Sequence, residues 1–274
     1  MKKQCLFTCM AALLLSHTSC MKEESIQETS GVESRAQTTE QKVQNLIQQA
    51  RYGVTEAYKS LAICYRDGNG VQKSNINAIF MYNIYCQKTG KKFEDIIELL
   101  DERHPYRLLV EIMLSPSFDE EVEMKFSQLQ QVAPEEAKWI EALRTNPANM
   151  LEILQEAENE GSELAGILQT FHYVESKDTI NYEHSLTRLA TKHPFLYTEI
   201  ALIHNSKYDA DNDFSHIQKV LECYYQADSF GMLSPRKANE LWSLYDYFSQ
   251  KGLIEYDEIE VERLKRIVKK ENKI

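Results

Sequence analysis

The sequence predicts an all-α protein, an α-solenoid in which about fourteen helices form antiparallel pairs. Apolar residues recur at steps of three and four from Val43 onward, and no segment shows the sustained alternation of a β-strand. Prolines stand where helices are expected to begin, and glycines stand where they are expected to end. The prolines are Pro116, Pro134, Pro147, Pro194 and Pro235, and the glycines are Gly53, Gly68, Gly90, Gly161, Gly231 and Gly252.

The N-terminus has the pattern of an export signal. Lys2 and Lys3 precede an apolar run from Cys5 to Leu15. That run is too short to span a bilayer as a helix, which needs about 20 residues. Residues 1–19 are therefore predicted to be a signal peptide that is removed on export.

The stretch from Leu15 to Cys20 resembles the cleavage box of bacterial lipoproteins, in which a small residue precedes a cysteine that becomes diacylated. Ser19 is the small residue and Cys20 the lipidation site, whereas His17 departs from the usual aliphatic residue. The resemblance implies a palmitate-bearing membrane lipoprotein of the bacterial cell envelope, with the outer membrane or the cell surface favoured. An ordinary secretory signal with an incidental cysteine is the alternative.

Residues 20–40 are expected to form a lipidated, disordered tether. Between Met21 and Glu40 the chain has no aromatic residue and hardly any aliphatic ones. Such a segment buries too little apolar surface to offset the entropy of ordering it. It is therefore expected to hold the folded part away from the membrane.

The mature chain is strongly acidic. Without Lys2 and Lys3 it has 29 basic and 42 acidic residues, a formal charge of −13. Nucleic acid is therefore excluded as a partner, and the membrane is contacted through the lipid anchor only. One basic cluster near the C-terminus is interpreted as a solvated helix end, whose cations suit the negative pole of the helix dipole. It comprises Arg263, Lys265, Arg266, Lys269, Lys270 and Lys273.

Three cysteines, Cys64, Cys86 and Cys223, remain beyond the signal and the lipidation site. We expect them to be buried and unpaired. One disulfide with one free thiol is the alternative, because an exported protein enters an oxidising compartment.

A cap helix and a first helical hairpin are predicted over residues 41–92. Ala57, Leu61, Ala62 and Tyr65 fall on one face of a first helix, which Gly68 should end in a left-handed conformation. Gly70 permits a tight reversal of the chain, and the side chain of Val71 is expected to pack the loop against the core. Ser74 or Asn75 should cap a second helix, which packs back on the first and ends at Gly90. The residues expected to pack back are Ala78, Met81, Tyr82 and Tyr85.

This hairpin resembles the Sel-one-like repeat, a relative of the tetratricopeptide repeat. The match lies in Tyr65-x-x-Gly68-x-Gly70-Val71, followed by an alanine seven residues later at Ala78. The resemblance implies a right-handed solenoid whose concave face binds other polypeptides. Residues 161–274 are expected to hold degenerate repeats and a C-terminal capping helix, with one hairpin over 161–192. Residues 93–160 match least and are either divergent repeats or an inserted helical bundle.

No motif for catalysis, metal binding or a cofactor stands out. The glycines at 68 and 70 lack the lysine and the preceding strand of a phosphate loop. The histidines lack zinc spacing, and His204 replaces the tyrosine of the repeat, which predicts a partly buried core position. The acidic runs at 119–121 and 156–160 are interpreted as solvated helix faces or helix starts. We therefore predict no enzyme, no cofactor, no metal and no catalytic residue.

The predicted function is an envelope-associated scaffold or adaptor for protein–protein interaction. Its partner-binding inner face is expected to present Glu56, Lys59, Ile63, Arg66, Thr198, Leu202 and Asn205. One alternative is an immunity or inhibitor lipoprotein that neutralises a toxin, whose basic charge would complement the acidic chain. The other is an enzyme acting on cell wall or polysaccharide, located in residues 93–160.

Overall fold

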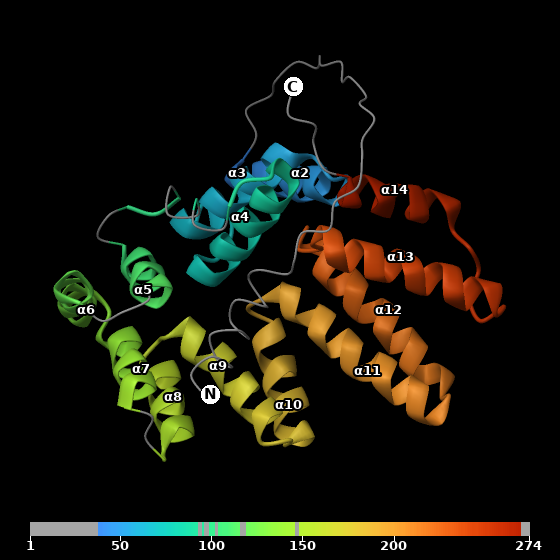
Figure 1. Ribbon diagram of the computed structural model, residues 1–274. Coiled ribbons are helices and arrows are strands. Elements are labelled where there is room, and N and C mark those ends of the chain that lie inside the picture. Colours follow the sequence, from blue (N-terminus) through green and yellow to red (C-terminus); the bar gives the residue numbers. More distant parts are fainter. Residues whose placement is uncertain are drawn as a thin grey trace. The chain divides into compact units, whose positions relative to one another are not determined.

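The computed structural model describes residues 38–92, 95, 99–101, 104–115, 119–145 and 148–269 (Figure 1). These residues form thirteen α-helices and no strand, and consecutive helices pack on one another as in a helical solenoid, which confirms the all-α prediction. They divide into two compact units, a middle unit (residues 95–189) and an end unit (residues 38–92 and 190–269). The predicted signal peptide, Cys20 and nearly all of the predicted tether lie outside the described residues.

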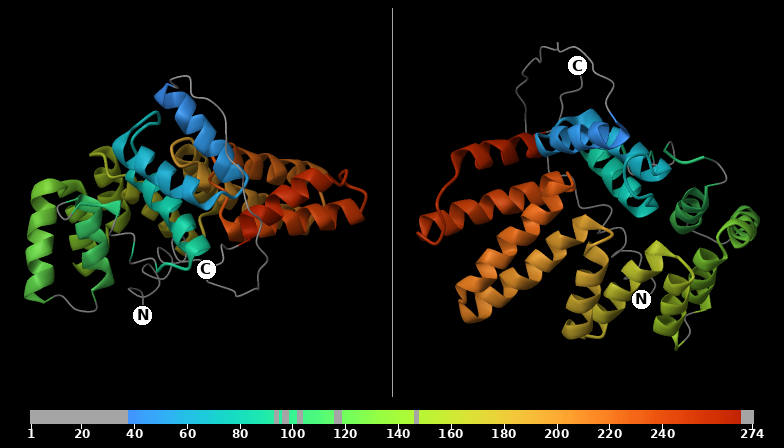
Figure 2. Two further views of the ribbon diagram at one scale, coloured as in Figure 1. Left: turned by 90° about the horizontal axis from the view of Figure 1, so that it is seen from above. Right: turned by 180° about the vertical axis from the view of Figure 1, so that it is seen from behind.

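The end unit is assembled from both ends of the described chain. Its helices are α2 (Thr39–Arg51), α3 (Thr55–Asp67), α4 (Asn75–Thr89), the 3₁₀ turn η2 (Pro194–Leu196), α11 (Tyr197–Asp211), α12 (Phe214–Ser229), α13 (Pro235–Gln250) and α14 (Glu258–Val268). Helix α2 packs on α12 and α14, and α4 packs on α13. Figure 2 shows from two further sides that α14 lies beside α2. The N-terminal and C-terminal helices, which we expected at opposite ends of a linear array, therefore pack on each other within this unit.

The hairpin of α3 and α4 has the predicted local geometry. Gly68 ends α3 with φ 73°, and the hydroxyl of Ser74, rather than Asn75, caps α4 by accepting the N–H of Asn77. Gly70 has φ 73°, and a Cβ there would lie 2.8 Å from the carbonyl oxygen of Thr39. Only glycine fits such a conformation and approach. Most of the other residues of the repeat signature are buried, namely Ala57, Leu61, Ala62, Tyr65 and Ala78. Val71 is half-buried, and Gly90 has a left-handed backbone conformation.

Helix α4 lies at the centre of the end unit. Eleven of its fifteen residues are buried, including residues on the side that faces away from α3. The ring of Phe80 stacks on that of Phe195 with centroids 4.3 Å apart, and the amide of Asn77 donates to the carbonyl of Lys192. A helix that is apolar on all sides needs cover on all sides, and the C-terminal helices supply it.

The prediction that the C-terminal basic cluster is a solvated helix end is wrong for Arg263. This residue lies on α14 and is only 7% exposed, because α14 packs against α2 instead of capping the array alone. Arg266 and Lys269 are exposed and Lys265 is half-buried, while Lys270 and Lys273 lie outside the described residues.

The middle unit contains α5 (Pro105–Leu114), α6 (Glu120–Val132), α7 (Pro134–Thr145), α8 (Met150–Asn159), α9 (Glu163–Glu175) and α10 (Thr179–Ala190). Helices α5 to α9 pack each on the next, but α9 and α10 approach each other less closely than α8 and α9 do. Two helices therefore lie within the hairpin expected over 161–192, and α9 packs mainly on α8. The predicted boundary at 160 lies inside this unit.

Helix starts in the middle unit agree with the sequence where they are described. Pro105 and Pro134 open α5 and α7. The carboxylate of Asp119 caps α6 by accepting the N–H of Val122 at 3.1 Å, so this acidic run does stabilise a helix start.

No disulfide joins Cys64, Cys86 and Cys223, the cysteines of the described chain. Cys86 and Cys223 are buried, as predicted, whereas Cys64 is only half-buried because it lies at the edge of the exposed side of α3. Burial raises the pKa of Cys223 to about 11 and also raises that of Cys64, so both stay protonated at neutral pH.

Candidate functional site

The predicted binding residues of α3 lie on one side of that helix. Glu56 and Ile63 are exposed, and Lys59 and Arg66 are half-buried. These positions follow steps of three and four, so they form a stripe opposite the buried residues of α3. We call these four residues the α3 stripe. Ile63 is 36% exposed, which leaves an apolar side chain accessible between two cations.

The two cations of the α3 stripe are held in place by neighbours. The ammonium of Lys59 lies 5.6 Å from the ring centroid of Tyr85, a cation–π contact with α4. The guanidinium of Arg66 donates from Nε to Asp67 at 2.7 Å, and this hydrogen bond lowers the pKa of the Asp67 carboxyl. The α3 stripe therefore presents oriented charges around one aliphatic side chain.

The predicted binding residues of α11 differ in their exposure to solvent. Leu202 is 40% exposed and Asn205 is half-buried. Thr198 is only 4% exposed and its hydroxyl donates to the carbonyl of Phe195 at 2.8 Å, so it cannot contact a partner. The cause is the 3₁₀ turn before α11, which buries the first turn of this helix. Helices α3 and α11 do not pack closely, so the two predicted sets form no continuous stripe.

His204 is half-buried, as expected, and its Nδ1 lies 3.2 Å from Nδ1 of His216 on α12. The Nε2 of His216 lies 3.3 Å from the carboxylate of Asp211. Across the described part of the chain, no group of three or more His, Cys, Asp or Glu side chains is arranged to hold a metal ion.

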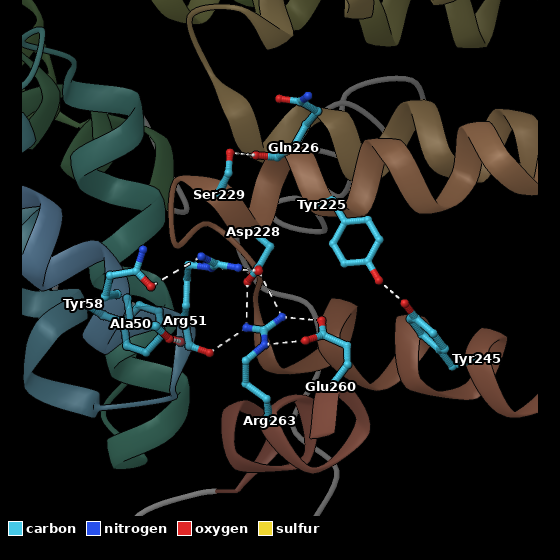
Figure 3. A network of polar contacts seen from close by, with 11 residues as sticks. Ala50, Arg51, Tyr58, Tyr225, Gln226, Asp228, Ser229, Tyr245, Glu260 and Arg263 are labelled. Carbon is cyan, nitrogen blue, oxygen red and sulfur yellow. Dashed lines mark hydrogen bonds and ion pairs between the residues drawn. The ribbon is translucent and has the colours of Figure 1, made fainter. Parts of the chain in front are cut away.

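A buried ionic cluster joins the two ends of the end unit (Figure 3). Asp228 on α12 is 0% exposed and accepts from Arg51 of α2 at 3.0 Å and from Arg263 of α14 at 3.1 Å. Arg263 also donates to the carbonyl oxygen of Arg51 at 2.7 Å and to Glu260 at 2.6 and 2.8 Å. Two guanidinium groups thus share one buried carboxylate, which links three helices.

Further contacts surround this cluster. The hydroxyl of Tyr58 donates to the carbonyl of Ala50 at 2.6 Å, and burial raises the pKa of Tyr58. The hydroxyls of Tyr225 and Tyr245 meet between α12 and α13, and burial raises the pKa of Tyr245 to about 12 (Figure 3). These phenols stay neutral and act as packing and hydrogen-bonding groups.

Lys88 on α4 makes a second contact between the N-terminal and the C-terminal helices of the end unit. It is 2% exposed, and its ammonium donates to the carbonyls of Ile267 at 3.0 Å and Lys269 at 2.7 Å. The last carbonyls of a helix have no partner within the helix, so a cation there satisfies both hydrogen bonding and the helix dipole. The sequence indicated none of the partners that join the N-terminal to the C-terminal helices, because these partners are 177 to 212 residues apart.

The middle unit has its own buried carboxylate. Glu136 on α7 is 2% exposed and accepts from the indole of Trp139 at 2.6 Å, from Ser162 at 2.8 Å and from the hydroxyl of Tyr106 at 3.2 Å. Burial raises the pKa of Glu136, and the three hydrogen bonds oppose that rise. The cluster ties α5, α7 and the start of α9 together. Its carboxylate is enclosed by its donors, which is the geometry of a structural cluster.

None of the helices described is both long and apolar enough to cross a membrane. Comparison of the chain with family models, with curated proteins and with solved structures found no match.

Proposed function

We propose that the protein is a lipid-anchored scaffold or adaptor of the bacterial envelope that binds another protein through the α3 stripe. The observation that carries this proposal is the exposed Ile63 between two oriented cations, on a helical hairpin that resembles a Sel-one-like repeat. An aliphatic side chain ringed by fixed charges suits a polypeptide partner, because burial supplies affinity and the charges select the partner. The proposal includes anchoring through a diacylated Cys20 and assigns no catalytic activity and no nucleic-acid partner.

Affinity capture from solubilised envelopes tests the proposal. The bait is the mature, anchored protein, and captured proteins are identified by mass spectrometry. We expect Lys59→Glu combined with Arg66→Glu to lose partners that the wild type retains. A matched control reverses two exposed cations elsewhere in the end unit, Lys42→Glu with Lys73→Glu, and should keep them. Failure to capture any partner would contradict the scaffold, and full retention by the first variant would contradict the α3 stripe.

A second test addresses the anchor. Cys20→Ser should move the protein from the membrane fraction to the soluble fraction, because stable anchoring needs the acyl chains. A wild-type protein that is already soluble after export would contradict lipidation and support an ordinary secretory signal.

An inhibitor lipoprotein that neutralises a basic toxin is a second candidate, favoured by the charge of the middle unit. The full sequence span of this unit, residues 94–189, contains 21 acidic and 7 basic residues, a formal charge of −14. An inhibitor would form a tight one-to-one complex with a single captured protein, whereas a scaffold would recover several. The stoichiometry of the captured complex separates the two.

A further inference from the structure

Helix α6 has one wide side that packs on none of the described residues of the middle unit. It buries only Val122, Phe126 and Leu129, which form one narrow stripe. At about 100° per residue, Met124 lies opposite that stripe. Met124 is 56% exposed, and Val132, two turns further along, is 49% exposed. We call this side, with Gln128 between these two residues, the α6 face.

The α6 face has negative charge at its N-terminal end, near Met124. Glu120 and Glu121 are exposed in the first turn of α6. The one base of this helix, Lys125, is turned toward α5, where its ammonium lies 3.2 Å from Glu111, and it pairs with Glu121 at 2.7 Å. The whole unit carries the formal charge of −14 derived above. Glu121 is therefore neutralised locally, whereas Glu120 and the net charge of the unit keep the surroundings of Met124 negative.

We propose that the α6 face is a second docking surface, and that it takes a basic amphipathic segment of another protein. Apolar residues of such a segment would cover Met124 and Val132, while its Lys and Arg side chains would face the carboxylates. An unbranched, polarisable methionine adapts to partners of different shape. The acidic field of the unit steers a cationic partner toward this face.

This inference rests on the proposed scaffold function and deepens it. An adaptor needs two surfaces, and these two differ in charge. Lys59 and Arg66 stand beside the apolar residue of the α3 stripe, whereas Glu120 and Glu121 stand one turn before Met124 of the α6 face.

Helix α14 supplies a matched control. Ile259 is 84% exposed, more than Met124, and it is flanked by Glu258 and Glu262. The same helix carries Arg263, Lys265 and Arg266, so its charge is mixed. If exposure of an apolar side chain near carboxylates were enough, Ile259 would bind the same probe.

The test measures binding of two synthetic peptides to the full-length mature protein by fluorescence anisotropy. One is an amphipathic helix of leucine and lysine, and the other is an oligolysine of equal charge. We expect the amphipathic peptide to bind about tenfold more tightly than oligolysine, because it also buries apolar surface. Binding should weaken strongly in about 0.5 M salt, which screens the charges.

Three variants locate the site. Met124→Gln with Val132→Gln should weaken binding of the amphipathic peptide about tenfold, the loss expected for two apolar side chains that are partly covered. Glu120→Gln with Glu121→Gln should reduce its salt dependence, and Ile259→Gln should change nothing. Equal binding of both peptides, or wild-type binding by the first variant, would overturn the α6 face.

The α3 variant keeps this test separate from that of the proposed function. Lys59→Glu with Arg66→Glu should bind the amphipathic peptide as the wild type does. Loss of envelope partners in that variant, together with unchanged peptide binding in the α6 variants, would refute the α6 face and leave the scaffold standing. Peptide binding at α6 without any captured envelope partner would refute the scaffold.

Discussion

Replacing Asp228 by asparagine tests whether the buried ionic cluster holds the two chain ends together. The substitution keeps the size of the side chain and removes the negative charge that faces Arg51 and Arg263. Because the carboxylate is 0% exposed, the guanidinium of Arg263, itself 7% exposed, would lose this counter-charge and keep only that of Glu260. Removing one partner of a buried pair costs about 3–5 kcal/mol. In a protein of this size that corresponds to a fall of roughly 10 °C in melting temperature.

The assay is urea unfolding followed by circular dichroism, with thermal melting as a second reading. The matched control is Glu222→Gln on the exposed side of the same helix, where the carboxylate pairs with Lys219 at 2.9 Å. An exposed pair contributes about 0–1 kcal/mol, so the control should stay close to the wild type. If Asp228→Asn costs no more than this control, the cluster does not carry the stability that we assign to it.

Three further substitutions test single contacts. Lys88→Met should lower the free energy of unfolding, measured in urea, by about 1–3 kcal/mol, because two carbonyl oxygens at the end of α14 lose their donor. A loss no larger than that of the exposed Lys42→Met would refute the contact. Burial raises the pKa of Glu136 above 4.5, its ordinary value, so the unfolded state releases the proton first and stability falls as the pH rises from 4.5 through the raised pKa. In Glu136→Gln that part of the pH dependence should vanish, and an unchanged profile of melting temperature against pH would contradict the burial effect. Gly53→Ala should destabilise the end unit more than Gly90→Ala does. Both glycines have positive φ, but only at Gly53 would a Cβ lie 2.6 Å from a backbone carbonyl oxygen of α14. Equal losses of stability would contradict that close approach.

Local features were predictable from the sequence because neighbouring residues determine them. Gly68 ends α3, and Ser74 caps α4, since a left-handed turn and a side-chain acceptor act within one turn of the helix. The same holds for Asp119 at the start of α6. The stripe of Glu56 to Arg66 followed from the helical period alone.

The closure of the end unit was not predicted, because its contacts join residues far apart in the chain. Asp228 stands among the residues expected to form degenerate repeats, and its partner Arg51 is 177 residues away. One signal was present in the sequence. Helix α4 is apolar on all sides, from Ile76 to Tyr85, and such a helix requires cover beyond its own hairpin.

The prediction for Thr198 was wrong for a related reason. Its position was transferred by offset from α3, but a 3₁₀ turn precedes α11 and no such turn precedes α3. The 3₁₀ turn covers the first turn of α11, so Thr198 is buried although Leu202, one turn further along the same side, is exposed.

Hydrogen exchange measured peptide by peptide tests whether α2 to α4 and α11 to α14 form one cooperative unit. The slowest amides of α3 and α4 should open with the same free energy as those of α12 to α14, because all belong to one packed unit. Asp228→Asn should lower both values equally and leave residues 105–189 unchanged. Amides of α2 to α4 that keep their wild-type protection in this variant would contradict the claim.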